Sequence, residues 1–252
     1  MKKAFLMVAA AAAMLVTGFT ACKSNSPEPP EPPKPPLPKE IDIYVAGIDE
    51  SGAEDAAKVW KNGKELYSLT DGSKFAAAYS VFVVGGDVYT AGCEDNGKNK
   101  IVKVWKNDKE LYALTDGSDY AGANSVFVAE DKVYTVGNDG NVAKLWKNKS
   151  ATDLTDGSKS AIARSVYVVG DDVYVAGGEG GVTKVWKNGE ELYELADKCH
   201  ANSIVVYNGD VYVAGFEGEG SNLEPKVWKN GKELYSLANK GIARSIFIVE
   251  RK

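Results

Sequence analysis

The 252-residue sequence contains little of the usual catalytic and metal-binding chemistry. Its one histidine, His200, directly follows Cys199, and the pair fits no spacing typical of a zinc site, a nucleophile or a catalytic triad. The other cysteines are Cys22 and Cys93, and their placement predicts no disulfide framework, although a bond between Cys93 and Cys199 stays open. We expect no cofactor, no metal and no enzyme activity.

The sequence also lacks an excess of positive charge and has few long apolar runs. A formal net charge of −5 argues against nucleic acid as a partner. The one alanine-rich apolar run, residues 4–18, follows Lys2 and Lys3. Because it is too short to span a bilayer, it is typical of a secretory signal.

The next four residues, Phe19-Thr20-Ala21-Cys22, resemble the lipobox of bacterial lipoproteins, although Phe19 replaces the usual aliphatic residue. The resemblance implies a signal peptide over residues 1–21 and a palmitate-type lipid anchor on Cys22. It also implies a place in the bacterial cell envelope, on the outer membrane, facing the periplasm or the outside. The alternative is a plain cleaved signal with a chance cysteine.

Proline is concentrated between residues 24 and 39, where it alternates with Glu and Lys. Such a segment has nothing to bury and adopts extended polyproline II, at about 3.1 Å per residue. We predict that residues 22–40 form a tether and that residues 41–252 form a domain held roughly 50 Å from the membrane.

The domain is predicted to be built from five repeats. Trp-Lys-Asn recurs every 40 to 45 residues, a period typical of propeller blades. The five tryptophans are Trp60, Trp105, Trp146, Trp186 and Trp228. Each unit has two strand-like runs around a tight turn and two more around Asn-Gly or its equivalent, which gives four strands. In the third unit, one residue is missing and Lys149-Ser150 is expected to replace the usual turn.

The chain ends predict how the ring closes. Residues 41–47 match the second strand of a unit without a first strand, and residues 244–249 match a first strand with nothing after it. We therefore expect an all-β, five-bladed β-propeller in which the C-terminal strand completes blade one and removes an open edge. The alternative of β-sandwiches would show alternating polarity and no strict period.

The Val-Tyr-Val-Ala-Gly and Lys-Val-Trp-Lys-Asn-Gly motifs resemble those of bacterial β-propeller repeat lipoproteins from host-associated anaerobes. The resemblance covers residues 41–252. It implies the same fold and location, and no particular chemistry.

Length varies in two connections of each unit, which in a propeller emerge on one face. We expect this face to be acidic and the face of the Trp-Lys-Asn turns to be basic. The acids counted on the variable face are Asp49, Glu50, Glu54, Asp55, Glu94, Asp95, Asp139, Glu179, Glu217, Glu219 and Glu224. The alternative is that solvated turns are simply charged.

A second candidate feature is the pattern Ala-x-Ser before each innermost strand. Its middle residues are Tyr79, Asn124, Arg164, Asn202 and Arg244, all able to offer hydrogen bonds, and they are expected to form a ring at the mouth of the central channel. The alternative is a water-filled, purely structural channel. The constant Ser is expected to hydrogen-bond to the backbone.

Two further motifs lie in the connections between units. Phe75 and Tyr120 occupy matching positions, where aromatic rings either stack on a sugar or pack under their own loop. Thr-Asp-Gly-Ser, which begins at Thr70, Thr115 and Thr155, resembles a calcium loop, but we interpret it as an ordinary turn.

Taken together, the sequence favours a monomeric, membrane-tethered binding module that engages a glycan, peptide or protein ligand. The alternative is a passive envelope scaffold. A glycosidase using loop acids such as Asp49, Asp95 or Asp139 is a third hypothesis.

Overall fold

A computed structural model describes residues 41–251, apart from the side chains of Ala196 and Asp197. By its contacts the chain divides into two units, residues 1–40 and 41–252. The predicted signal, the lipidated Cys22 and the tether all lie outside the described residues. Within residues 41–251 no helix is long and apolar enough to cross a membrane.

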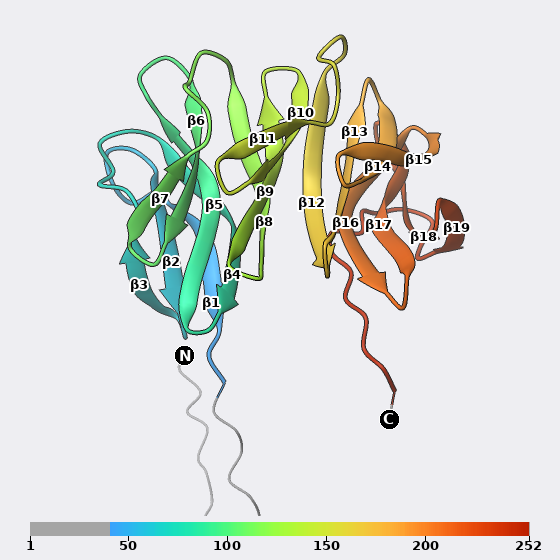
Figure 1. Ribbon diagram of the computed structural model, residues 1–252, viewed down its shortest axis with the longest axis horizontal. Helices are drawn as coiled ribbons and strands as arrows, with labels where there is room; N and C mark the ends of the chain where they lie inside the picture. Colours follow the sequence, from blue (N-terminus) through green and yellow to red (C-terminus); the bar gives the residue numbers. More distant parts are fainter. Residues whose placement is uncertain (1–40, 252) are drawn as a thin grey trace, which may run out of the picture. The chain divides into compact units, whose positions relative to one another are not determined.

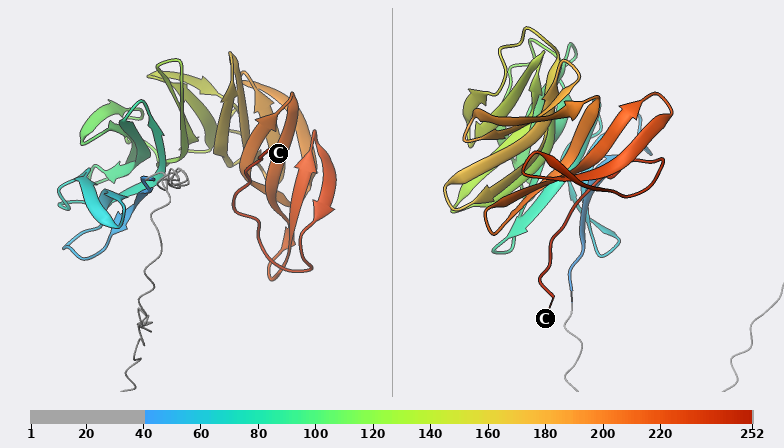
Figure 2. Two further views of the ribbon diagram at one scale, coloured as in Figure 1. Left: turned by 90° about the horizontal axis from the view of Figure 1, so that it is seen from below. Right: turned by 90° about the vertical axis from the view of Figure 1, so that its right-hand side faces the viewer.

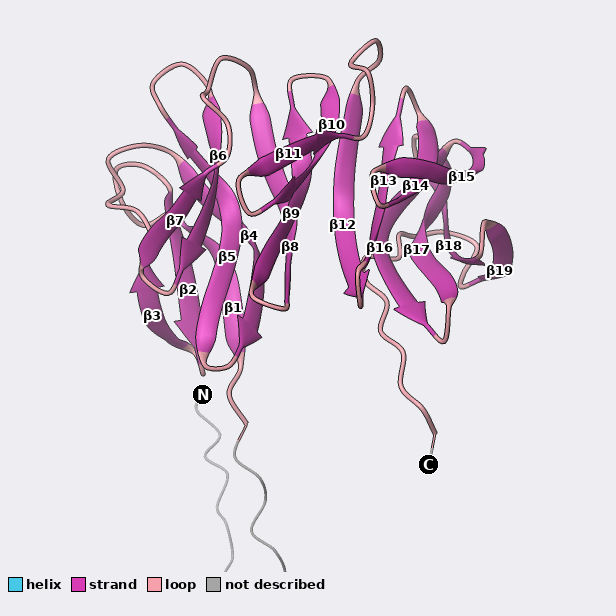
Figure 3. Ribbon diagram, in the orientation of Figure 1, coloured by secondary structure: helices cyan, strands magenta, loops and turns pink. Residues whose placement is uncertain are grey.

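The described chain is all β, with nineteen strands in five antiparallel sheets, which we number 1 to 5 in chain order (Figures 1 and 3). Sheet 1 contains β1 (Tyr44–Asp49), β2 (Ala56–Lys61) and β3 (Lys64–Ser68). Sheet 2 contains β4 (Ala76–Val84), β5 (Asp87–Asp95), β6 (Lys100–Lys106) and β7 (Lys109–Ala113). Sheet 3 contains β8 (Ala121–Ala129), β9 (Lys132–Asp139), β10 (Val142–Lys147) and β11 (Ser150–Asp153). Sheet 4 contains β12 (Ala161–Val169), β13 (Asp172–Glu179), β14 (Val182–Lys187) and β15 (Glu190–Asp197). Sheet 5 contains β16 (Cys199–Tyr207), β17 (Asp210–Glu219), β18 (Asn222–Lys229) and β19 (Lys232–Ser236).

Tight turns set the hairpins of each sheet. In the second hairpin of sheet 4, Asn188 and Gly189 have φ values of 55° and 91°, the left-handed pair that a type I′ turn requires. In sheet 3 the turn is Asn148-Lys149, since Lys147 pairs with Ser150, so the expected Lys149-Ser150 turn is wrong. The residue missing from this unit is instead the one that bulges in the outer strand of the other four sheets.

Tryptophans fill the interfaces between neighbouring sheets, which follow one another around an arc (Figure 2). Trp186 of sheet 4 packs against Tyr134 and Val136 of sheet 3, and Trp228 packs against Tyr174 of sheet 4. Trp105 and Trp146 pack in the same way against sheets 1 and 2. Trp60 has no preceding sheet against it and is only half-buried.

The predicted closing strand is not formed. Sheet 1 has three strands, and residues 237–251 carry no strand. The C-terminal segment instead lies along sheet 5, where the Ile246 amide donates to Ser203 Oγ at 3.3 Å. Some of its apolar side chains therefore stay in solvent, Phe247 (84% exposed) among them, and so does Val45 of β1 (52% exposed).

Candidate functional site

The inner strand of each four-stranded sheet bulges at the middle residue of Ala-x-Ser. In sheet 4 the register shifts between Ala163 and Ser165, which places Arg164 in the bulge, and the same shift occurs in sheets 2, 3 and 5. A bulge turns the side chain of the extra residue out of the regular alternation. The facing strand must approach closely here, because a Cβ on Gly177 would lie 2.1 Å from the Ile162 carbonyl oxygen.

The repeated serine and the two asparagines of this pattern join each sheet to the next. Ser165 Oγ accepts the Ile204 amide at 3.2 Å, and the serines of the other inner strands accept in the same relation. Asn124 Nδ2 donates to the Ala163 carbonyl at 2.8 Å, as Asn202 Nδ2 does to the Ala243 carbonyl. The pattern is therefore a structural link as well as a candidate site.

Four of the five middle residues line one cavity of about 200 Å³, namely Asn124, Arg164, Asn202 and Arg244. They come from β8, β12, β16 and the C-terminal segment, far apart in sequence. A smaller cavity of about 110 Å³ also has Arg164 in its wall, together with His200 and Glu179.

The larger cavity is electropositive. Burial and the charge of Arg244 lower the pKa of the half-buried Arg164 guanidinium. Burial and the charge of Arg164 lower the pKa of His200, whose ring stacks on Phe216 with the centroids 4.6 Å apart. No carboxylate pairs with Arg164 or Arg244 within residues 41–251.

Tyr79, the fifth middle residue, is not among the residues that line this cavity. It is 48% exposed, and its hydroxyl lies beside the Cys93 thiol, with burial raising the pKa of the phenol. Cys93 and Cys199 are buried in different sheets, and no disulfide joins them.

Phe75 and Tyr120 lie around the same lysine. Lys100 Nζ is 4.0 Å from the centroid of the Phe75 ring and 5.4 Å from that of Tyr120, which is 62% exposed. Both distances fit cation–π contacts. The two rings therefore share one lysine, and stacking of a sugar on them stays a prediction.

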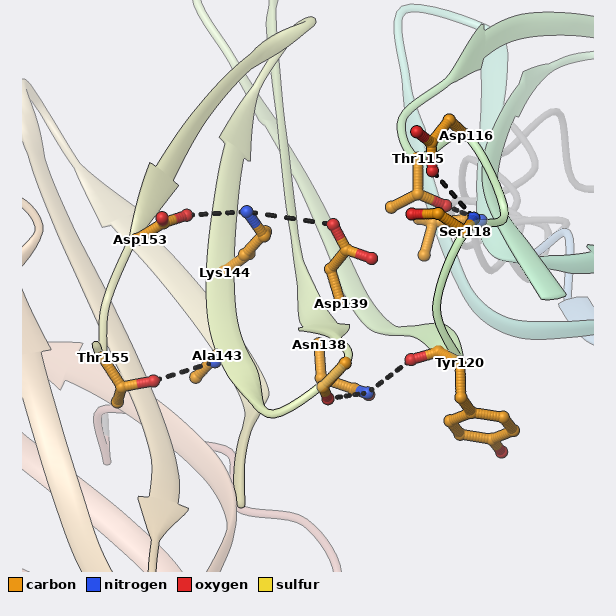
Figure 4. A network of polar contacts seen from close by, with 12 residues as sticks. Thr115, Asp116, Ser118, Tyr120, Asn138, Asp139, Ala143, Lys144, Asp153 and Thr155 are labelled. Atoms are coloured by element: carbon orange, nitrogen blue, oxygen red, sulfur yellow. Dashed lines mark hydrogen bonds and ion pairs between the residues drawn. The ribbon is translucent and has the colours of Figure 1, made fainter. Parts of the chain in front are cut away.

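A lysine two residues before each tryptophan holds carboxylates that the sequence analysis had assigned to the variable face. In sheet 4, Lys184 Nζ lies 2.9 Å from Glu179 and 2.8 Å from Glu191. In sheet 3, Lys144 lies 2.8 Å from Asp153 and 3.8 Å from Asp139 (Figure 4). Lysines in the other sheets pair in the same way with Asp49, Glu94 and Glu217.

These pairs reduce the free negative charge of that face, and they occupy two of the acids considered for a glycosidase, Asp49 and Asp139. The signal was present in the sequence. Each carboxylate lies five residues after the Tyr of the second strand, and this spacing is the same in all five repeats.

The Thr-Asp-Gly-Ser motifs make turns. Asp116 Oδ1 accepts the Ser118 amide at 2.8 Å (Figure 4). Asp71 and Asp156 accept in the same way. Thr155 Oγ1 accepts the Ala143 amide at 3.1 Å, which pins the turn to the third strand of its sheet. Within residues 41–251 no group of three His, Cys, Asp or Glu side chains is arranged to hold a metal ion.

No family model matches the chain, and no curated protein matches it. Among solved structures, it is similar to the crystal structure of the computationally designed Ika4 protein, with 18% sequence identity and a TM-score of 0.42. That likeness covers 66% of this chain and 98% of the designed one.

Proposed function

We propose that the protein is a binding module and that the cavity between its inner strands engages the ligand. The observation that supports this is the convergence of Asn124, Arg164, Asn202 and Arg244 on one hollow. Three of these residues lie in strand bulges, a device often found beside functional sites. A polar hollow built from successive repeats suits a glycan, a peptide or a protein loop.

Glycan-array and pull-down measurements on the wild type and on the double variant Arg164→Gln/Arg244→Gln test this proposal. Arg251→Gln is the matched control, since Arg251 is exposed and does not line the cavity. We expect ligands that the control retains and the double variant loses. Ligands that both variants retain would exclude the cavity, and no ligand at all would favour a passive scaffold.

We also propose that the ring closes as a five-bladed propeller, with residues 245–249 pairing with β1. Residues 243–246 already contact sheet 5 as an inner strand contacts the sheet before it, through Asn202 and Ser203. By the register of the other sheets, Val45 would face Ile246 and Tyr44 would face Phe247. Closure would cover the exposed Val45 and Phe247 and pair the open β1 edge of sheet 1.

Gly47 supports closure. In sheets 2 to 5 the equivalent glycine faces a backbone carbonyl of the inner strand, at 1.8 to 2.1 Å from an added Cβ. At Gly47 an added Cβ would meet only the Trp60 side chain, at 3.1 Å. A Cβ at Gly47 would press on Trp60 already, and a C-terminal strand in the register of the other sheets would add the Ile242 carbonyl to the groups that require a glycine here.

For the cellular setting, we propose a lipid anchor on Cys22 and an extended tether over residues 22–40, which would hold the binding module away from the outer membrane. Metabolic labelling with palmitate tests the anchor. We expect label on the wild type and none on Cys22→Ala, together with loss of the variant from the membrane fraction. Label retained by Cys22→Ala would contradict the anchor.

A further inference from the structure

The choice of basic residue at the cavity is unusual for this chain. The sequence contains 27 lysines and three arginines, and two of those arginines, Arg164 and Arg244, line the cavity. Lysine serves as the ion-pairing residue elsewhere, as in the pair of Lys184 with Glu179. Arginine differs from lysine in its planar fork of five N–H donors, which matches the oxygens of a carboxylate, sulfate or phosphate.

Within residues 41–251, neither guanidinium group has an anionic partner. The other residues that line this cavity are the neutral amides of Asn124 and Asn202. Glu179 lines the neighbouring hollow, but Lys184 already holds it at 2.9 Å. Burial together with like charge at Arg164 is unfavourable in the empty protein, and an anion from outside would relieve it.

The side-chain amides of Asn124 and Asn202 add N–H donors to those of the two arginines. Each Nδ2 uses one N–H on a backbone carbonyl, that of Ala163 in β12 or of Ala243 in the C-terminal segment, which fixes the orientation of the side chain. A second N–H on each Nδ2 remains for a ligand. At about 200 Å³ the hollow is smaller than the roughly 300–1,000 Å³ typical of pockets for whole small molecules, so it suits one terminal group.

We propose that the cavity binds an oxyanion at the end of a larger ligand, a carboxylate, sulfate or phosphate. Arg164 and Arg244 donate to its oxygens, and the amides of Asn124 and Asn202 complete the donor set. This inference rests on the proposed function and specifies its ligand class. A local positive hollow on a chain of net charge −5 also orients an approaching anion toward this one place.

Calorimetric titration of the purified protein with glucuronate, sulfate and inorganic phosphate tests the proposal, with glucose as the neutral match for glucuronate. The chain has one histidine, so the NMR signal of His200, beside Arg164 in the wall of the smaller cavity, reports binding at this place without assignment. We expect at least one anion to bind and to shift this signal, and glucose to do neither. The binding anion identifies the source as a carboxylate, a sulfate or a phosphate.

Variants distinguish anion binding in the cavity from nonspecific attraction of anions to positive charge. We expect Arg164→Gln to weaken binding roughly ten- to hundredfold, the usual worth of a charge-assisted hydrogen bond, and Arg164→Lys to weaken it less. Arg251→Gln should bind as the wild type does. An unfolding temperature of Arg164→Gln no lower than that of the wild type, by circular dichroism, shows that the fold is intact.

Two results would overturn the inference. If none of the three anions binds, or if Arg164→Gln binds them as tightly as the wild type, the cavity is not an oxyanion site. The proposed function is judged separately, because a neutral glycan or peptide lost only by the Arg164/Arg244 double variant would uphold it while excluding the oxyanion.

Discussion

Arg164 differs from the lysines of the scaffold in the charges that surround it. The lysine at the third strand of each sheet is matched by carboxylates, as Lys184 is by Glu179 and Glu191. Arg164 is half-buried, and the charge that acts on its pKa is that of another arginine, Arg244. A charged group held in this way without compensation is typical of a functional site.

His200 gives a first prediction at this scale. Burial, followed by the charge of Arg164, lowers its pKa below 6.5. We expect Arg164→Gln to raise the His200 pKa and Arg251→Gln to leave it unchanged, measured by NMR titration of the single imidazole. The same pKa in the wild type and in Arg164→Gln would show that the guanidinium does not lie near the ring.

The same shift predicts a dependence of stability on pH. Because the folded pKa of His200 lies below its unfolded value of 6.5, the unfolded state binds more protons between the two values. The free energy of unfolding should therefore fall as the pH decreases from 6.5 through the folded pKa, and fall less in Arg164→Gln. Urea denaturation at several pH values above 5 measures this, and identical slopes for the two proteins would contradict it.

At the scale of the strand, the bulge in each inner strand depends on the glycine that faces it. Gly177→Ala would place a Cβ 2.1 Å from the Ile162 carbonyl oxygen, so we expect a loss of about 3 kcal/mol or more of unfolding free energy. Gly122→Ala is the control, because its nearest neighbour is an Asn138 side-chain oxygen at 3.6 Å. Similar effects of the two substitutions in chemical denaturation would contradict the bulge.

The lysine at the third strand gives a second prediction for this scale. In Lys184→Met, Glu179 loses its partner while its side chain stays 14% exposed, so we expect a loss of roughly 1–3 kcal/mol, between the values for exposed and buried pairs. Lys187→Met removes an outer pair with Asp172 and should cost under about 1 kcal/mol. Urea denaturation compares them, and an equal or larger effect of Lys187→Met would argue against the inner pair.

The strands could be predicted from the sequence because each repeat contains the same apolar runs and the same turn residues. Asn188-Gly189 predicts its hairpin turn, and the structure forms it, with both residues in the left-handed region. The pairing of Lys184 with Glu179 was not predicted. Each of the two positions keeps a constant spacing in every repeat, that of Glu179 from the Tyr of the second strand and that of Lys184 from the Trp, whereas the binding face was inferred from loops whose lengths differ between repeats. The gathering of Asn124, Arg164 and Asn202 was predicted from equivalence, whereas the place of Tyr79 was not, since it depends on its contact with Cys93.

For the whole molecule, the central question is whether the first and last repeats meet. Four of the five tryptophans are buried against the preceding sheet, and Trp60 lacks such a neighbour. The C-terminal segment lies on sheet 5 in the place of a further inner strand, and Gly47 has the small size that such a strand requires. Closure also bears on binding, because Arg244 lies on that segment.

The most direct measurement is disulfide trapping of β1 to the C-terminal segment in a chain that carries Cys22→Ser. In the closed register, Val45→Cys/Ile246→Cys places two thiols directly opposite one another. Val45→Cys/Phe247→Cys moves the second thiol by one residue, so that the two thiols lie on opposite faces of the sheet. We predict that the first pair oxidises rapidly within a monomer, seen as a faster band on non-reducing gels, and that the second does not. Equal oxidation of the two pairs, or bonds formed only between two chains, would contradict a ring closed by the chain's own C-terminus.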